Sequence, residues 1–198
     1  KILLYSVDFA EIEHYQASGD WAKSAEVLSQ IAQKLEQAGA DFIVICTNTM
    51  HKVAPPIQKQ IAIPILHIAQ ATAEALLENG IQKVGLLGTK YTMTQDFYKE
   101  KLLEAGLEVL IPDQAGITEV NRIIYDELCL GDIKDSSKQT YLTIIDDLKN
   151  AGAKAVILGC TEIGLLVKQA DTALPLYDTT TIHAQKAAEL AINGWLLC

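Results

Sequence analysis

Two short segments of the chain place a cysteine among residues that bind polar ligands. The first reads Cys46-Thr47-Asn48-Thr49 and the second reads Gly159-Cys160-Thr161-Glu162. Each follows an apolar run, so each is expected at the carboxyl end of a buried strand, just before a helix. A thiol there lies near unpaired N–H groups and the positive end of the helix dipole, which lower its pKa. These residues indicate thiol-based acid–base chemistry, whereas a cysteine that is only a small buried side chain is the plainer alternative.

These segments end a unit that occurs twice in the sequence. Residues 38–47 (the first copy) align without a gap on residues 151–160 (the second copy), a shift of 151 − 38 = 113 positions. The alignment places Thr47, and not Cys46, on Cys160. The duplication predicts two lobes of one plan, whose strand ends face one ligand from opposite sides.

Short apolar runs alternate with helical patterns along the chain, as in doubly buried parallel sheets. The predicted strands are residues 2–7, 42–46, 64–67, 84–88, 107–111, 155–159 and 174–177. One predicted helix starts after the N-cap Asp20 and ends before Gly39. The alternation predicts an α/β fold of two pseudo-symmetric, Rossmann-like (doubly wound, parallel-sheet) lobes with the active site in the cleft between them.

The repeat also predicts the lobe boundaries. The first lobe is expected to comprise residues 1–82 together with residues 183–198, which contain a last helix over residues 183–197, and the second lobe residues 83–182. The second copy is preceded by a further strand that starts at Val84, and 84 − 113 = −29, so its partner is expected before Lys1. We therefore expect an N-terminally truncated chain whose first lobe lacks its first strand and helix.

The composition is that of an acidic globular protein. The 198 residues are 49% hydrophobic and carry a formal net charge of −9. Nucleic-acid binding requires a basic face, so no nucleic-acid partner is expected. No apolar stretch reaches the eighteen or so residues of a membrane span, and no signal peptide is visible. A cytoplasmic protein without a membrane partner is expected, and the four widely spaced cysteines agree with a reducing compartment.

The two cysteine segments together resemble the paired signature of the aspartate/glutamate racemases, a family of cofactor-independent amino-acid racemases. The resemblance covers essentially the whole chain. Its further marks are residues 6–9, 66–69, 87–93, 124–131 and 177–179. It implies an isomerase that racemises aspartate, glutamate or a related small polar amino acid by two-base deprotonation and reprotonation at Cα, without pyridoxal phosphate, metal or nucleotide. The implied partner is a small-molecule amino acid, and a homodimer stays open.

The resemblance also assigns the two bases. The family's first motif usually reads Cys-Asn-Thr, and the register that matches Asn48 and Thr49 puts Thr47 in the place of the catalytic cysteine, opposite Cys160. A threonine hydroxyl is a poor base unless it is activated. Cys46 is expected to point to the other face of the strand as a buried structural residue.

Further residues are implied to bind the substrate. A neutral amide at residue 16, where aspartate-specific relatives tend to carry a cation, favours a broader choice of side chains. For each threonine helix capping is an equal alternative, and a first-turn glutamate often only complements the helix dipole. The implied substrate-binding residues are Gln16, Asn48, Thr49, Thr89, Thr92, Thr161 and Glu162.

Two other interpretations remain open on the sequence, and a third is not favoured. A related thiol-dependent isomerase or decarboxylase of small dicarboxylates would use the same thiol. A catalytically weak amino-acid-binding protein would agree with a threonine in place of one base. A metal site of His51 with Cys46 and Cys160 is not expected, because the spacing is irregular and a fourth ligand is not evident.

Overall fold

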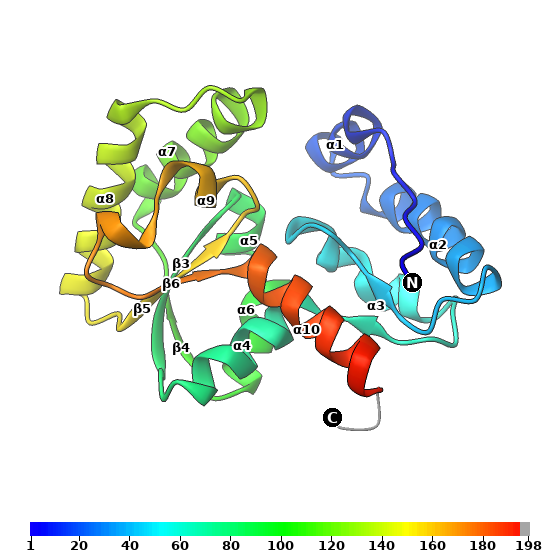
Figure 1. The fold of residues 1–198 in the computed structure, drawn as a ribbon. Helices are drawn as coiled ribbons and strands as arrows, with labels where there is room; N and C mark the ends of the chain where they lie inside the picture. Colours follow the sequence, from blue (N-terminus) through cyan, green and yellow to red (C-terminus); the bar gives the residue numbers. More distant parts are fainter. Residues whose placement is uncertain (195–198) are drawn as a thin grey trace. The chain divides into compact units, whose positions relative to one another are not determined.

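A computed structural model describes residues 1–194 and divides them into two compact units (Figure 1). The first unit comprises residues 1–45 and 50–67, and the second comprises residues 46–49 and the chain from residue 68 onward. The predicted lobes divide the chain by its repeat, whereas these units divide it by internal contacts, so the predicted lobe boundaries stay a prediction. The predicted last turn of the final helix, at residues 195–197, lies outside the described residues.

The first unit is built around a short pair of parallel strands. Its elements are α1 (Phe9–Ser18), α2 (Trp21–Gln37), β1 (Ile43–Val44), the 3₁₀ helix η1 (Thr49–Val53), α3 (Ala54–Gln58) and β2 (Ile65–Leu66). As predicted, Asp20 caps α2, and its carboxylate accepts a hydrogen bond from the Lys23 amide. Apolar side chains of α2, β1, η1 and α3 form one buried cluster, which holds this unit together.

The strand predicted for residues 2–7 is wrong for the described chain. These residues precede α1 without joining a strand ladder, and the side chains of Ile2 and Leu4 are 92% and 81% exposed. An apolar run forms a strand only where a neighbouring strand takes up its backbone N–H and C=O groups. In the described first unit, β1 pairs with β2 instead.

The second unit contains a four-stranded parallel sheet. Its strands are β3 (Lys83–Gly88), β4 (Glu108–Leu110), β5 (Ala155–Gly159) and β6 (Leu176–Asp178), in the order β4-β3-β5-β6. The helices are α4 (Ile68–Glu78), α5 (Lys90–Thr94), α6 (Asp96–Glu104), α7 (Gln114–Asp126), α8 (Asp135–Asn150), α9 (Ile163–Leu166) and α10 (Thr179–Asn193), with 3₁₀ turns η2 (Leu128–Leu130) and η3 (Gln169–Asp171). The strands predicted from residues 84, 107, 155 and 174 are thus confirmed within a few residues.

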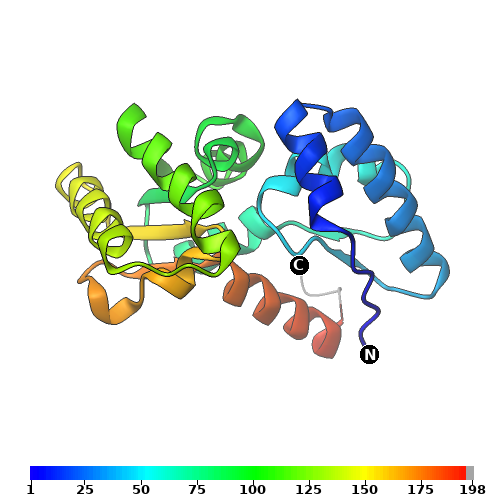
Figure 2. The same ribbon diagram turned by 90° about the horizontal axis from the view of Figure 1, so that it is seen from above.

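Alternating side chains of the two central strands supply two buried layers. Leu87, Val156 and Leu158 pack with residues of α7 and α8, whereas Leu86 and Ile157 pack with residues of α4 and α6. Figure 1 shows α7 and α8 on one face of the sheet with α4 and α6 on the other, and Figure 2 shows α7 and α8 lying over the strands. Strands covered on both faces must be apolar throughout, which explains the short apolar runs.

The internal repeat is confirmed by its hydrogen bonds. The Ala40 amide donates to the Leu35 carbonyl at 3.1 Å, and the equivalent Ala153 amide donates to the Leu148 carbonyl at 3.0 Å. The glycine between helix and strand has positive φ in both copies, 92° at Gly39 and 103° at Gly152. This αL helix ending needs no tertiary support, so the same short sequence directs the chain from helix to strand twice.

Candidate functional site

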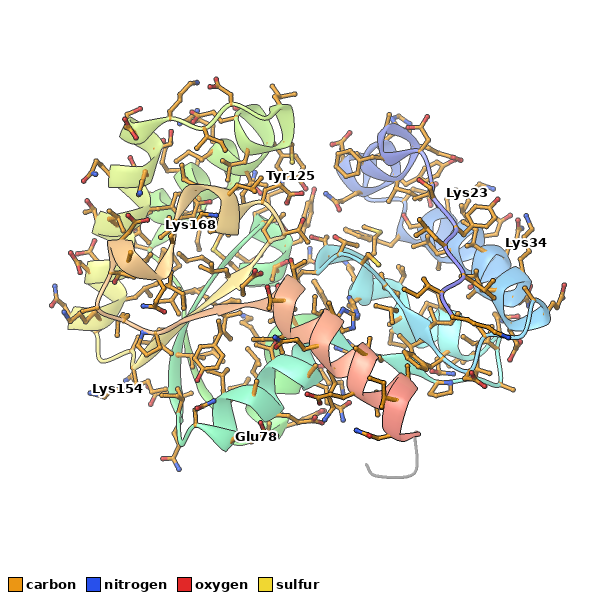
Figure 3. The ribbon with its side chains drawn as sticks, viewed as in Figure 1. Lys23, Lys34, Glu78, Tyr125, Lys154 and Lys168 are labelled. Atoms are coloured by element: carbon orange, nitrogen blue, oxygen red, sulfur yellow. The ribbon has the colours of Figure 1, made fainter. Side chains whose placement is uncertain are left out.

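The predicted site residues of the second unit gather where its strands end. Figure 3 marks the two ends of the sheet: Glu78 and Lys154 precede β3 and β5, and Tyr125 lies at the opposite end. Ligands of open parallel sheets bind beyond the carboxyl ends of the strands. The polar residues that follow β3, β5 and β6 therefore form the candidate site.

Asn48 is connected to this edge through Thr179. The Asn48 Nδ2 group donates to Thr179 Oγ1 at 3.0 Å, and Thr179 Oγ1 donates to the Leu158 carbonyl at 2.9 Å. The Thr179 hydroxyl has a single proton, which it donates to the Leu158 carbonyl. It must therefore accept the hydrogen bond from the Asn48 amide nitrogen, which fixes the orientation of the Asn48 side chain. The buried Asn48 Oδ1 has no hydrogen-bond partner within the described chain. It is an acceptor held in place for a donor that the described residues do not supply.

Three threonine hydroxyls form a buried chain beside Asn48. Thr49 Oγ1 lies 3.0 Å from Thr89 Oγ1, which lies 3.3 Å from Thr92 Oγ1. Thr89 is also the N-cap of α5 and accepts from the Thr92 amide at 3.4 Å. Thr89 therefore has the capping role that was the alternative for each threonine, and the implied substrate binding by these three residues stays a prediction. Thr92 is fully buried.

Two paired glycines let the central strand ends approach closely. Gly88 and Gly159 are partners in the β3–β5 ladder. A Cβ atom on Gly88 would lie 2.7 Å from the Gly159 carbonyl oxygen, and one on Gly159 would lie 2.8 Å from the Leu87 carbonyl oxygen. Both distances are too short for any side chain, so glycine is required at the last position of β3 and at the last position of β5.

Cys160 and Glu162 form a thiol–carboxylate pair directly after β5. Cys160 is buried, and its Sγ donates to Glu162 Oε2 at 2.9 Å. Burial and the negative carboxylate raise the pKa of the Cys160 thiol well above its usual range. The expectation of a lowered thiol pKa is therefore wrong for this structure, since α9 has only four residues and its dipole does not outweigh these two effects.

Other groups face Cys160 from neighbouring elements. The carboxylate of Glu162 also raises the pKa of the Cys129 thiol on η2, second to burial. Tyr141 of α8 is fully buried, and its pKa is raised mainly by burial and then by Cys160. Cys129 and Tyr141, like Thr179, were absent from the predicted site. Only the position of Thr179 immediately after β6 could have indicated it.

The remaining predicted site residues are Thr47, Thr161 and Gln16, and no hydrogen bond described above joins them to the Cys160–Glu162 pair. Thr47 and Thr161 are partly buried, and the predicted role of Thr47 as a base stays a prediction. Cys46 is exposed, which corrects the expectation of a buried structural thiol. Gln16 lies on α1 of the first unit and is buried there, so its predicted contact with a substrate also stays a prediction.

His51, which could have suggested a metal, lies in the first unit. Its ring is buried beside that of His67, with 4.5 Å between the ring centroids. Across residues 1–194, His, Cys, Asp and Glu side chains form no group of three or more that could hold a metal ion. Over the same range, no helix combines the length and apolar character needed to cross a membrane. The expected absence of a metal or cofactor stays a prediction.

Comparison with solved structures supports the fold. A putative Asp/Glu racemase from Yersinia pestis is 52% identical, with a TM-score of 0.91 over 97% of this chain and 84% of that chain. An aspartate racemase homologue from Pyrococcus horikoshii OT3 is 40% identical, with a TM-score of 0.83 over 96% of this chain and 83% of that one. The glutamate racemase from Aquifex pyrophilus, at 20% identity and a TM-score of 0.62, shares the fold over 86% of this chain and 67% of that one. The predicted fold class, α/β with two Rossmann-like lobes, is confirmed.

Curated relatives point to the same group. The broad specificity amino-acid racemase RacX of Bacillus subtilis (strain 168) is 25% identical over 156 residues, which are 78% of this chain and 66% of that protein. A glutamate racemase of Glaesserella parasuis is 26% identical over 174 residues, which are 87% of this chain and 63% of that protein. The chain thus spans just under two thirds of these two racemases. Residues 1–187 match the family described as Asp/Glu/Hydantoin racemase, so the chain belongs to that family.

Proposed function

We propose that this protein racemises aspartate, glutamate or a related small polar amino acid without pyridoxal phosphate. Cys160 serves one face of Cα, and Thr47, acting through a water molecule, serves the other. The observation that carries the proposal is the buried Cys160 thiol, which donates to the Glu162 carboxylate at 2.9 Å. A thiol held beside a proton acceptor can work as an acid in one direction and as a base in the other.

The proton balance of such a reaction is simple. Cys160 passes its proton to Glu162, and the resulting thiolate removes the α-hydrogen, so an S–H bond forms as the Cα–H bond breaks. On the opposite face, water held by Thr47 gives a proton to the carbanion, and a new Cα–H bond forms. The water regains a proton from solvent and Glu162 releases one, which restores both groups. In the other direction the Cys160 thiol donates its proton to Cα.

The free acceptor of Asn48 supports an amino acid as the substrate. Its buried Oδ1 atom has no partner among the described residues, and it would accept a hydrogen bond from a substrate ammonium group. The nearby hydroxyls of Thr49 and Thr89 would donate to the α-carboxylate.

The side chain of the substrate is the less specified part of the proposal. The neutral amide of Gln16 favours uncharged polar side chains as well as carboxylates. The name of the curated relative RacX describes a broad-specificity racemase, which supports the same choice. The predicted lobes, the cleft between them, a homodimer, a cytoplasmic location and the absence of cofactors all belong to this proposal.

Isotope exchange tests the proposal. The protein is incubated in deuterium oxide with L-Asp, L-Glu and L-homoserine in turn, and deuterium at Cα and the D-enantiomer are measured by mass spectrometry and chiral chromatography. We expect both to appear with at least one substrate and to be lost in Cys160→Ser. Release of carbon dioxide from a dicarboxylate would instead identify a decarboxylase. Thermal stabilisation by an amino acid without exchange would identify a binding protein.

A further inference from the structure

The turn between α7 and α8 contains a buried carboxylate that the proposed chemistry does not use. The side chain of Glu127 is only 5% exposed. Its carboxylate accepts from Ser137 Oγ at 2.5 Å and from Arg122 Nη1 at 2.8 Å, and Lys134 Nζ lies 3.7 Å away. The hydrogen bond from Ser137, followed by Arg122 and Lys134, lowers the pKa of Glu127, so the buried group is ionised.

The backbone of the same residue closes the turn. The Glu127 carbonyl accepts from the Leu130 amide at 2.9 Å and from the Asp132 amide at 3.0 Å, and its own amide donates to the Ile123 carbonyl at 3.2 Å. Side chain and backbone together connect the end of α7, the η2 turn and the start of α8. Glu127 is therefore the point at which η2 is held.

The η2 turn packs beside the thiol site. It packs against α9, the helix that begins after Glu162, and Leu128 of η2 belongs to the same buried cluster as Cys160 and Ile163. Packing of this kind excludes water from the thiol. If η2 moved away from α9, water would reach Cys160.

We infer that Glu127 is a positioning residue of the thiol site, which holds η2 against α9 and so keeps Cys160 buried. This inference deepens the proposed function, because Cys160 is the proposed acid and base. Glu127 acts through the turn, and its motif, Ile124 to Gly131, was identified in the sequence without a physical role.

The expected direction of change follows from the groups around the thiol. Cys160 faces Glu162 from its own loop, Cys129 from η2 and Tyr141 from α8, and burial is the largest cause of its raised pKa. Loosening η2 admits water, which stabilises the thiolate and lowers the pKa of Cys160. The alkylation of Cys160 should then speed up at neutral pH, since the thiolate is the reacting form.

The experiment measures alkylation of the whole chain by iodoacetamide across a pH series, with the Cys160 peptide quantified by mass spectrometry. In Glu127→Gln the rate at neutral pH should rise about threefold to tenfold, as a shift of half to one pH unit in the midpoint requires. The matched control is Glu119→Gln, which removes the other carboxylate that binds Arg122, at 2.7 Å, and leaves the Glu127 contacts in place. It should alkylate as the wild type does.

A second variant separates the effect of the position of the Glu127 side chain from the effect of its charge. Ser137→Ala keeps the Glu127 charge and removes only its shortest hydrogen bond, so the midpoint should shift in the same direction. Wild-type midpoints in both folded variants, or an equal shift in Glu119→Gln, would overturn the inference. Circular dichroism checks folding, and loss of the fold in both Glu127→Gln and Ser137→Ala would also overturn it, by making Glu127 a residue of global stability. Because alkylation reads the thiol directly, the result does not depend on whether the protein is a racemase.

Discussion

The two copies of the repeat end in segments that share a backbone plan and differ in chemistry. In the second copy, the fully buried β5 strand leads into a thiol and a carboxylate that contact each other. In the first copy, the two-residue β1 strand leads into neutral groups, Asn48 and Thr49, which are held by hydrogen bonds to Thr179 and Thr89. The two copies share the turn from helix to strand and differ in the residue types at the strand ends. After their proposed roles, we call the Cys160 and Glu162 end the reactive side and the Asn48 and Thr49 end the ligand-binding side.

The reactive side should be the more sensitive of the two. We expect Cys160→Ser to lower turnover by about 10³-fold or more, because a hydroxyl does not replace a thiol in proton transfer at carbon. Cys46→Ser is the matched control: this thiol is exposed, and the change should leave turnover within about twofold. Racemisation rates of the two folded variants measure the contrast. Equal inactivity of the two variants would mean that Cys46, and not Thr47, faces the substrate in the first copy.

The ligand-binding side should depend on Thr179. Thr179→Val removes a hydroxyl that accepts from Asn48 and donates to Leu158, so two buried polar groups lose a partner. We expect a loss of about 1–3 kcal/mol in the free energy of unfolding and a raised KM, because the Asn48 amide is no longer oriented. Urea unfolding and initial rates check both. Thr180→Val, at an exposed neighbouring position, is the control, and an equal effect there would remove the role given to Thr179.

The Cys160 thiol on the reactive side should contribute to the pH dependence of stability. Burial and Glu162 raise the folded-state pKa of Cys160 above its ordinary value near 9. The folded protein therefore holds this proton more tightly than the unfolded chain does. The stabilisation is complete below pH 9 and is lost as the pH rises toward the folded-state value, by up to about 1.4 kcal/mol per pH unit. Unfolding free energies from pH 7 to 10 should fall less steeply for Cys160→Ser than for the wild type, and parallel curves would contradict the assignment.

The smallest expected effect comes from a variant that gives both copies a thiol at the equivalent position. Thr47→Cys restores a thiol in the first copy, and the slower of the two racemisation directions should become about threefold to tenfold faster, because a thiolate forms more readily than an alkoxide. The equilibrium mixture cannot change, since the two enantiomers have equal free energies. Initial rates from pure L and pure D substrate measure the change. A variant that is slower in both directions would instead make Thr47 a substrate-binding group.

Local signals in the sequence were enough to predict the repeat and most of the sheet. The Ala-Gly-Ala helix ending depends on residues a few positions apart, and buried parallel strands must be apolar, so the second unit could be read from its pattern. The same patterns placed Cys160 and Glu162 together after a strand, because they lie two positions apart, whereas the hydrogen bond between them was not predicted. The strand predicted at residues 2–7 was wrong, since an apolar run carries no information on whether a partner strand lies beside it.

Only the tertiary structure decided the environment of the site. Asn48 and Thr179 are 131 positions apart, and no local rule connects them. The direction of the pKa shift at Cys160 was also decided there: the sequence indicates a helix start that lowers the pKa, whereas burial in the core of the second unit and the facing Glu162 carboxylate raise it. Sequence by itself determines which groups follow each strand, because that order is covalent. Their solvation and partners come from segments distant in the chain, and these two properties determine whether a thiol stays protonated.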